Sequence, residues 1–501
     1  MAFKKMRRQP LPLLLAAVIL SAGYLQAQAP PQPVRPAQAP PQPVKIGPVT
    51  FSGNLRTRIE AHDFFRDGAA ENSYTFSGSL LRLSFSQQTK HFDWQAELAA
   101  PILLGVPDNA VAPGVQGQLG QGGSYLVAND LSRNSGMVFL KQGFLRFKGL
   151  GGSEAQSLRL GRYEFLDGAE TTPKDPTLAY VKRERIAQRL VGNFGWVHVG
   201  RVVEGVQYVY NKPNTNLTVL AARPIRGVFQ VDAWGGLDIG VFSVALTRAI
   251  PLKNSAGEWR AFAIQYDDWR RVLKTDNRAL AARRGDTDHI RITTAGGNYL
   301  HAFNSDVGKF DLLFWGVLQT GMWGVLDHRA GAGAVEAGYQ PPIALKPWIR
   351  AGFFHGTGDG NPNDREHNTF FQILPTARVY ARYPFYNLMN SQDLSTELLL
   401  RPHPRLTVRS AMHWLRLSSR NDLWYLGPGA FQPWSFGYAG RPSNGNRGFA
   451  NVFDINADIQ VNPHSTIGMY FANVQGKTVI SSIYPNGPSS RFGYVEFTYR
   501  F

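Results

Sequence analysis

The chain has 501 residues and carries 53 Lys and Arg against 36 Asp and Glu, a formal net charge of +17 at pH 7. Only 43% of the residues are hydrophobic, and no window beyond the amino terminus offers the roughly 20 uncharged apolar residues that a spanning helix needs. Composition thus excludes a bundle of membrane helices. The absence of cysteine agrees with an exported protein that needs no disulfide.

The amino terminus has the parts of a secretory signal. A basic stretch, Lys4 to Arg8, precedes an apolar run from Leu11 to Leu20, and Ala27-Gln28-Ala29 supplies the small residues of a cleavage site. We therefore predict that residues 1–29 are a removed signal peptide. The alternative is a membrane anchor, but an apolar run of about ten residues is too short to span a bilayer.

The next segment contains a repeat. The residues from Ala29 to Val34 (APPQPV) recur from Ala39 to Val44. Proline at this density fixes an extended polyproline conformation, so we predict a proline-rich periplasmic tether over residues 30–45. The alternative is a recognition ligand for a partner protein.

The remaining residues, 46–501, lack a clear internal boundary and contain alternating segments. From Phe51 to His62, apolar side chains fall on one face of an extended chain and polar ones on the other. This polar face carries Asn54, Arg56, Arg58, Glu60 and His62. The same alternation places on other polar faces Arg82, Arg146, Arg291, Arg350 and Arg409. Such faces would meet solvent in a soluble sheet and line the lumen in a barrel; the apolar opposite faces favour the lumen.

The last ten residues form the clearest of these segments. Gly493, Val495, Phe497, Tyr499 and Phe501 share one face of an extended chain that ends in an aromatic. A terminal strand of this kind is typical of outer-membrane β-barrels, whose assembly machinery reads the final aromatic. The alternative is an edge strand of a soluble sandwich.

Chain length predicts the size of the barrel. At about 22 to 28 residues per strand with its loop, residues 46–501 give roughly 16 to 20 strands, and bacterial barrels of one chain take even numbers. We predict an all-β fold, a transmembrane antiparallel β-barrel of about 18 strands over residues 46–501, with no separate plug domain. A barrel of this width leaves a water channel unless loops fold inward.

The charge predicts what the channel conducts. Loss of the four basic residues of the signal lowers the formal charge from +17 to +13. A cationic pore concentrates anions, and the planar fork of arginine binds both oxygens of a carboxylate. One alternative places this charge on outer loops, against anionic lipopolysaccharide. In another, the acidic lining residues cancel the arginines: Glu60, Asp93, Glu97, Asp454 and Asp458. Nucleic-acid binding is excluded for an exported chain.

A segment from Asp175 to Leu190 is unusually basic for a loop. The Asp-Pro start and the spacing of Leu178, Val181, Arg185 and Arg189 predict a short basic helix or an inward loop. Inside a barrel it would narrow the channel with cations. Just before it, Arg162 shares the parity of Leu160, so the alternation leaves its orientation open.

Several blocks resemble the alginate export family. They are Asn54 to Glu60, Leu160 to Glu164 with Asp167-Gly168, Arg189 to Gly192 with Trp196, Gly200-Arg201, Gly205-Val206, Gly356 to Asp364, Thr369-Phe370 and Leu374 to Thr376. The resemblance implies an 18-stranded outer-membrane porin with an arginine-rich, anion-selective channel that exports or admits acidic polysaccharide or other solutes. The chain departs from the family pattern in the basic insertion from Asp175 to Arg189 and at Tyr163.

The sequence holds no pattern for catalysis or a cofactor. Asp359, Asn361 and Asn363 resemble the start of a calcium loop, but Asp364 and Phe370 stand where that loop needs glycine and glutamate, so we predict an extracellular turn. No HExxH or GxSxG motif occurs. We predict no catalytic residue, no metal and no cofactor. The alternative is an outer-membrane hydrolase whose base would be one of His62, His91, His413 and His464.

Together these patterns predict a passive porin in the bacterial outer membrane. Its predicted pore-lining residues are Arg56, Arg58, Glu60, Arg82, Arg146, Arg162, Arg185, Arg189, Arg291 and Arg350. Its expected partners are an anionic, carboxylated solute or polysaccharide, outer-membrane lipids and lipopolysaccharide, the barrel-assembly machinery and periplasmic export partners. The main alternative is a weakly selective general porin. The sequence leaves open whether the solute is exported or taken up.

Overall fold

A computed structural model describes residues 43–66, 68, 72–111, 120–376, 382–427 and 429–501. The predicted signal peptide and most of the predicted tether lie outside these residues. The last two tether residues, Val44 and Lys45, belong to a short strand, β1 (Val44–Ile46), which turns back and pairs with residues 49–51. Here the predicted tether boundary falls within the sheet.

The described chain forms a closed antiparallel barrel of eighteen strands, which confirms the predicted fold class and strand number. The strands are β2 (Val49–Asp63), β3 (Ser73–Gln88), β4 (Phe92–Leu104), β6 (Phe139–Lys148), β7 (Gln156–Tyr163), β8 (Val203–Lys212), β9 (Thr215–Pro224), β10 (Ile239–Pro251), β11 (Ser255–Asp268), β12 (Ile290–Ser305), β13 (Gly308–Trp323), β14 (Leu326–Gln340), β15 (Trp348–Gly356), β17 (Ser391–His403), β18 (Leu406–Leu417), β21 (Gly448–Gln460), β22 (Ser465–Gly476) and β23 (Ser489–Arg500). Each pairs with the next, and β23 pairs with β2 from Asn54↔Arg500 to Asp63↔Arg491. Closure leaves no unpaired sheet edge, as a membrane requires.

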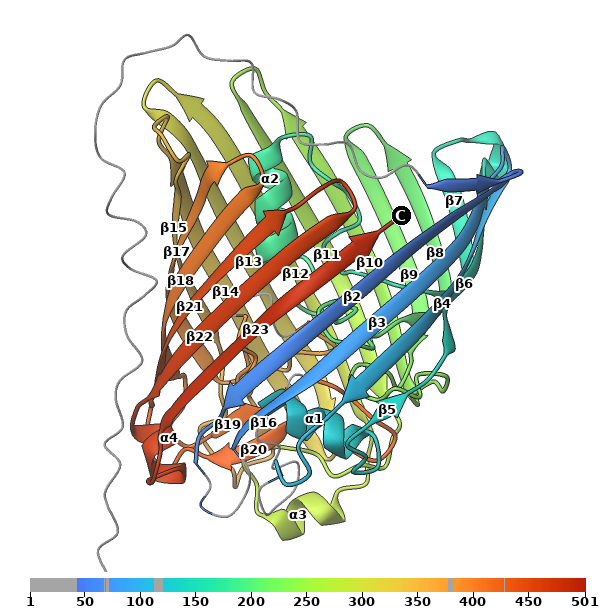
Figure 1. Ribbon diagram of the computed structural model, residues 1–501. Coiled ribbons are helices and arrows are strands. Elements are labelled where there is room, and N and C mark those ends of the chain that lie inside the picture. Colours follow the sequence, from blue (N-terminus) through green and yellow to red (C-terminus); the bar gives the residue numbers. More distant parts are fainter. Residues whose placement is uncertain (1–42, 67, 69–71, 112–119, 377–381, 428) are drawn as a thin grey trace, which may run out of the picture. The chain divides into compact units, whose positions relative to one another are not determined.

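Connections differ at the two ends of the barrel. The carboxy terminus lies at the end with short turns, and the long loops gather at the other end (Figure 1). The loops carry α1 (Gly120–Ala128), α3 (Leu280–Gly285), α4 (Thr478–Ile483), β5 (Ser135–Gly136), β16 (Glu366–His367), β19 (Leu423–Leu426) and β20 (Ala439–Pro442). In outer-membrane barrels short turns face the periplasm and long loops face outward. Within the described ranges, no helix is long and apolar enough to cross a membrane.

The side chains of each strand alternate between an outer and an inner face of the barrel. On the outer face, Ile59, Leu318, Val495 and Phe497 expose 58%, 75%, 55% and 43% of their surface, as lipid-facing side chains do. The residues that alternate with Ile59 and Leu318 are buried, and Glu496, between Val495 and Phe497, is half-buried. The predicted outward face of the final strand is therefore confirmed.

The terminal aromatic completes the seam between β23 and β2. Phe501 and Gly53 exchange two backbone hydrogen bonds of 3.0 and 3.1 Å. A Cβ on Gly53 would lie 2.3 Å from the Phe501 ring, so only glycine lets the ring lie flat on β2. The ring also contacts Phe51, with centroids 5.5 Å apart.

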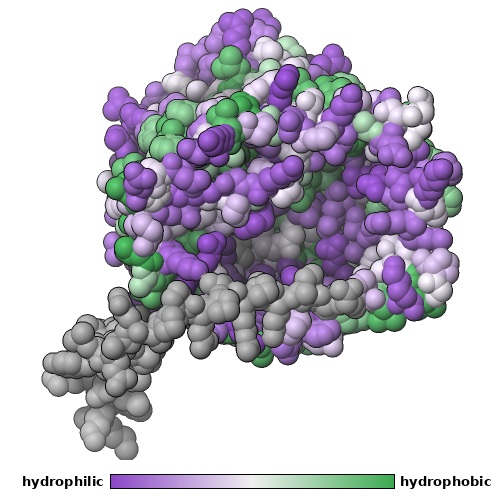
Figure 2. Space-filling view, turned by 90° about the horizontal axis from the view of Figure 1, so that it is seen from above, coloured by the Kyte–Doolittle hydropathy of each residue, from purple (hydrophilic) through white to green (hydrophobic). Residues whose placement is uncertain are grey.

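The long-loop half of the barrel is filled by loop side chains. Phe64, Phe385, Trp424 and Tyr484 belong to one buried cluster that loops and wall build together. From the short-turn end the barrel is hollowed, and hydrophilic residues surround the hollow (Figure 2). Inward loops thus take up space that the barrel alone would leave to water.

Candidate functional site

The connection between β7 and β8, residues 164–202, enters the barrel and lies against its inner wall. It contains α2 (Pro176–Val181) and a π-helical turn, η2 (Lys182–Ile186). Asp175 caps α2 by accepting hydrogen bonds from the backbone N–H groups of Thr177 and Leu178, and Pro176 takes the first helical position. The predicted short basic helix is present, and it is directed inward (Figure 1). We call residues 164–202 the inward segment.

Ion pairs and one tyrosine fix the inward segment to distant strands. The Lys309 ammonium of β13 contacts Asp175 at 2.5 Å, and Lys182 contacts Glu258 of β11 at 2.5 Å. The Tyr180 hydroxyl donates to Glu397 of β17 at 3.0 Å. Burial lowers the pKa of Lys182 despite the Glu258 carboxylate. Because these strands are spread around the barrel, the inward segment crosses the lumen instead of following one strand.

Glu336 of β14 is the centre of a buried cluster of three arginines. Its two oxygens accept from the Arg185 Nε at 2.9 and 2.8 Å, and Arg350 of β15 donates to it at 3.1 Å. Arg189 approaches it to 3.7 Å while its guanidinium lies 4.6 Å from the centre of the Trp315 ring. Burial opposes the charge on Arg185, but Glu336 outweighs it and raises the pKa of Arg185. The predicted lining residues Arg185, Arg189 and Arg350 therefore come together around one buried carboxylate.

A second cluster joins β2 to the end of the inward segment. Arg58 contacts Glu496 of β23 at 2.5 Å and Glu60 at 3.1 Å, and Glu60 is fully buried. His198 approaches Glu60 to 3.3 Å. Arg56 donates to the backbone carbonyls of Gly195, at 2.6 Å, and of Val197. Arg56, Arg58 and Glu60 thus point inward but are occupied by contacts with the wall and the segment.

Further along the wall the same pairing recurs. Arg82 of β3 contacts Glu97 of β4 at 2.7 Å and Glu164 at 3.2 Å. Near the short turns, Asp93 pairs with Arg146 and, at 2.7 Å, with Lys148. An arginine held by a carboxylate contributes less field to a channel than a free one. The lining is therefore a mixture of both signs.

Arg162 and Arg291 do not lie on the inner face, which corrects their predicted lining role. Arg162 pairs in register with Glu204 of β8, and their side chains form an ion pair at 2.9 Å. The Arg162 side chain lies on the same outward face as Leu160 and donates a hydrogen bond to the backbone carbonyl of Trp234. Arg291 exposes 69% of its side chain and pairs with Asp267 at 3.1 Å. Both sit near the long-loop rim, where the inner face packs on loop side chains and is apolar, so alternation puts the polar residues outside.

Some functional residues depend on distant partners and carry no local signal in the sequence. Glu258, Glu336 and Glu397 receive the inward segment, and nothing local in their strands marks them. Arg201 is 1% exposed and donates to the carbonyls of Leu374 and Gly429, both at 2.6 Å, and of Gly192 at 3.3 Å. Burial lowers its pKa to about 10. Its place after Gly200 was visible in the sequence, but its partners were not.

The acidic block from Asp359 to Asp364 forms successive turns. In each turn, a side-chain oxygen accepts a hydrogen bond from the backbone N–H two residues later. The acceptor is Asp359 for Asn361 at 3.0 Å, Asn361 for Asn363 at 3.2 Å, and Asp364 for Glu366 at 3.0 Å. These are local side-chain turns, as predicted for an extracellular loop. No group of three or more metal-binding side chains occurs in the part of the chain that the structure describes.

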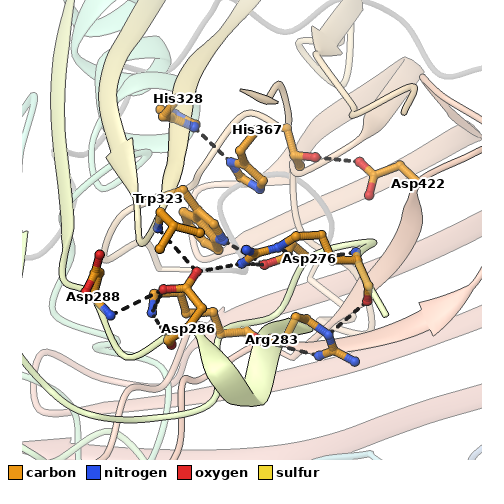
Figure 3. A network of polar contacts seen from close by, with 12 residues as sticks. Asp276, Arg283, Asp286, Asp288, Trp323, His328, His367 and Asp422 are labelled. Atoms are coloured by element: carbon orange, nitrogen blue, oxygen red, sulfur yellow. Dashed lines mark hydrogen bonds and ion pairs between the residues drawn. The ribbon is translucent and has the colours of Figure 1, made fainter. Parts of the chain in front are cut away.

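A buried histidine pair joins β14 to the loop that carries β16 (Figure 3). The Nδ1 atoms of His328 and His367 lie 2.8 Å apart, and the His367 ring stacks on Trp323 with centroids 4.1 Å apart. Gln319 exchanges hydrogen bonds with the backbone of Phe371, which orients its Oε1 toward His328 Nε2 at 3.3 Å. His328 therefore carries its proton on Nε2 and accepts the His367 Nδ1–H. A further proton on His328 Nδ1 would place two N–H groups face to face, and one on the buried His367 Nε2 would find no acceptor among the described residues.

We expect acid to release this loop. Burial, with the nearby Arg278 charge, lowers the pKa of His367 to about 3. A released histidine titrates near pH 6.5, so docking is complete above that pH and weakens as the pH falls from 6.5 toward 3, by about 1.4 kcal/mol per pH unit. Hydrogen exchange of the Glu366–Leu374 amides, corrected for intrinsic rates, should show this loss between pH 7.5 and 5.5. In the His367→Gln variant the dependence on pH should become weaker, whereas the exposed His464→Gln variant should keep it; an equal slope in both variants would contradict the assignment.

A closed eighteen-stranded barrel with a lipid-facing exterior and an inward segment across a polar lumen defines an outer-membrane channel. Residues 48–476 match the family model "Alginate export", and the chain belongs to that family. The protein is accordingly placed in the outer membrane.

Solved structures of outer-membrane channels share the fold. OccK9 (OpdG) of Pseudomonas aeruginosa matches with a TM-score of 0.56 at 10% identity, over 90% of this chain and 98% of that one. OccAB2 of Acinetobacter baumannii matches with a TM-score of 0.54 at 9% identity, and OpdK of Pseudomonas aeruginosa with a TM-score of 0.53 at 9% identity. Each of these two matches covers 90% of this chain and 98% of the other. No curated protein matches the sequence. The identities are too low to carry more than the fold.

Proposed function

We propose that the protein is a passive outer-membrane channel for anionic, carboxylated solutes or polysaccharide. The observation that supports this most is a cation of the inner wall without a carboxylate partner. Arg159 of β7 alternates with outward Leu160, donates to Gln207, and lies 4.3 Å from the Tyr163 ring, but forms no ion pair with any described carboxylate. Such a guanidinium keeps its field and its donors for a passing anion.

A property of one similar structure is consistent with this proposal. OpdK has been solved with vanillate, an aromatic carboxylate. The fold can therefore accommodate a carboxylated solute in that protein. The lipopolysaccharide contacts, the assembly machinery and the periplasmic export partners expected from the sequence are part of the same proposal.

A weakly selective general porin is the second candidate. Its support is the pairing of Arg58, Arg82, Arg185 and Arg350 with wall carboxylates, which leaves little net field from these arginines.

Reversal potentials across a salt gradient distinguish the two candidates. We expect an anion-to-cation permeability ratio above one that grows as salt falls, because screening shortens from about 10 Å at 0.1 M to about 3 Å at 1 M. Arg159→Gln should lower the ratio, and Arg291→Gln, the same change on the outer face, should leave it unchanged. A wild-type ratio close to that of free ions in water would favour the general porin.

A further inference from the structure

Two exposed arginines lie at the long-loop end of the seam where β23 and β2 run side by side (Figure 1). Arg491 is on the outward face of β23, and Arg66 follows the end of β2. Neither side chain forms an ion pair with any carboxylate that the structure describes. Asp63, the only described carboxylate on the outward faces from β18 round to β3, is half-buried and accepts a hydrogen bond from Asn72 at 3.4 Å. The outer surface of the seam therefore carries a net positive charge.

Two arginines on the opposite side of the barrel are, in contrast, paired with carboxylates. On the outer face of β12 and β14, Arg291 contacts Asp267 at 3.1 Å and Arg329 contacts Glu366 at 3.6 Å. A guanidinium held in this way has fewer donors left for an external ligand. Arg66 and Arg491 keep their donors, and the planar fork of arginine matches a phosphate as well as a carboxylate.

A row of hydroxyl groups runs from this rim into the lipid-facing wall. Four successive outward positions of β3 are serine or threonine: Ser73, Thr75, Ser77 and Ser79. Ser79 contacts the Thr57 hydroxyl of β2 at 3.1 Å, whereas the other three form no hydrogen bond with any residue that the structure describes. In register with Ser77, the flanking strands present Ile59 and Leu104, which are 58% and 52% exposed. Because a hydroxyl without a partner is unfavourable among lipid chains, the row favours a ligand with polar groups at this depth.

We infer that this part of the outer wall is a binding site for the lipid A portion of lipopolysaccharide. Arg66 and Arg491 bind a phosphate of its sugar head group, as basic surfaces of membrane proteins bind lipid head groups. The hydroxyl row of β3 binds the amide and hydroxyl groups at the start of its acyl chains, which lie just below the phosphates. A glycerophospholipid has a phosphate but only ester groups at that depth.

The position of the site agrees with this ligand, because the long-loop end of an outer-membrane barrel faces the leaflet that contains lipopolysaccharide. The inference rests on the proposed function for the lipopolysaccharide contact, to which it gives a site, and it is independent of the solute that the channel conducts.

Lipid binding to the folded full-length barrel in detergent tests the site, with phosphatidylglycerol as the comparison lipid. Native mass spectrometry would count the lipids bound to each barrel as the lipid concentration is raised. We expect lipid A to bind roughly tenfold more tightly than phosphatidylglycerol, which lacks the amide and hydroxyacyl groups. Equal binding of the two lipids by the wild-type protein would overturn the inference.

A matched pair of double variants assigns the binding to the seam. Arg66→Gln with Arg491→Gln should weaken lipid A binding roughly tenfold, the loss of charged hydrogen bonds to a phosphate. Arg291→Gln with Arg329→Gln, the same change at the paired arginines of the opposite side, should leave it unchanged. An equal effect of the two double variants would overturn the inference.

A third variant tests the hydroxyl row. Thr75→Val with Ser77→Ala keeps the wall apolar and should weaken lipid A binding while leaving phosphatidylglycerol binding unchanged. An unchanged preference for lipid A would overturn the role of the row. Because lipid binding is measured without conduction, an anion-selective channel that fails these tests would overturn only this inference, and a channel that passes them but lacks selectivity would overturn only the proposed conduction of anions.

Discussion

Replacing Glu336 with Gln is expected to destabilise the protein by about 3 to 5 kcal/mol, the cost of removing one partner from a buried ion cluster. The carboxylate holds Arg185 and Arg350 directly and Arg189 at longer range. Its loss leaves buried guanidinium groups that repel one another and releases η2 from the wall. Urea unfolding of the reconstituted barrel would measure the stability change, and hydrogen exchange of residues 176–190 would report the release.

A surface carboxylate provides the control for this change. Glu366→Gln removes a partner of Arg329 at 3.6 Å in an exposed pair, which contributes only about 0 to 1 kcal/mol. If Glu336→Gln cost no more than Glu366→Gln, the cluster would not be what holds the inward segment. Channel recordings should also show larger or noisier conductance in Glu336→Gln, because the segment then moves within the lumen.

Replacing Val495 with Arg is expected to cost about 2 to 4 kcal/mol and to impair assembly, because it places a charge on the lipid-facing side of β23. Val495 is 55% exposed and pairs with Ile59 and Met469, which are also exposed and apolar. Heat-modifiable gel mobility after outer-membrane extraction would measure the folded fraction.

The control for this prediction is the same substitution on the same face of β23 but nearer the membrane interface. Tyr499→Arg lies on the same face of β23, close to the short-turn interface, where a charge costs about 0 to 1 kcal/mol. Arg491 already occupies that face at the opposite end of the strand. Equal folding of the Val495→Arg and wild-type proteins would contradict the lipid-facing assignment.

The sequence by itself determined the architecture of the barrel. Alternation in residues 51–62 and 492–501 assigned the outward and inward faces of the first and last strands correctly, because a strand has a period of two and the membrane allows only apolar residues outside. Chain length predicted roughly 16 to 20 strands, of which we chose eighteen, because the average length of a strand with its loop, about 22 to 28 residues, falls in a narrow range in such barrels. The Asp-Pro cap predicted α2, because a helix start is a local signal.

Only the tertiary structure decided how the lumen charges are used. Arg185 and Glu336 lie 151 positions apart in the chain, and Tyr180 and Glu397 lie 217 apart, so no local pattern could pair them. Alternation assigned the polar face of Arg291 to the lumen wrongly, because near the long-loop rim the interior is filled by loop side chains and the inner face becomes apolar. For Arg162, alternation left the orientation open, and the contacts of the folded chain place it on the outward face of Leu160. A strand's period separates its two faces. What packs against each face depends on segments elsewhere in the chain, and that contact decides which face becomes the polar one.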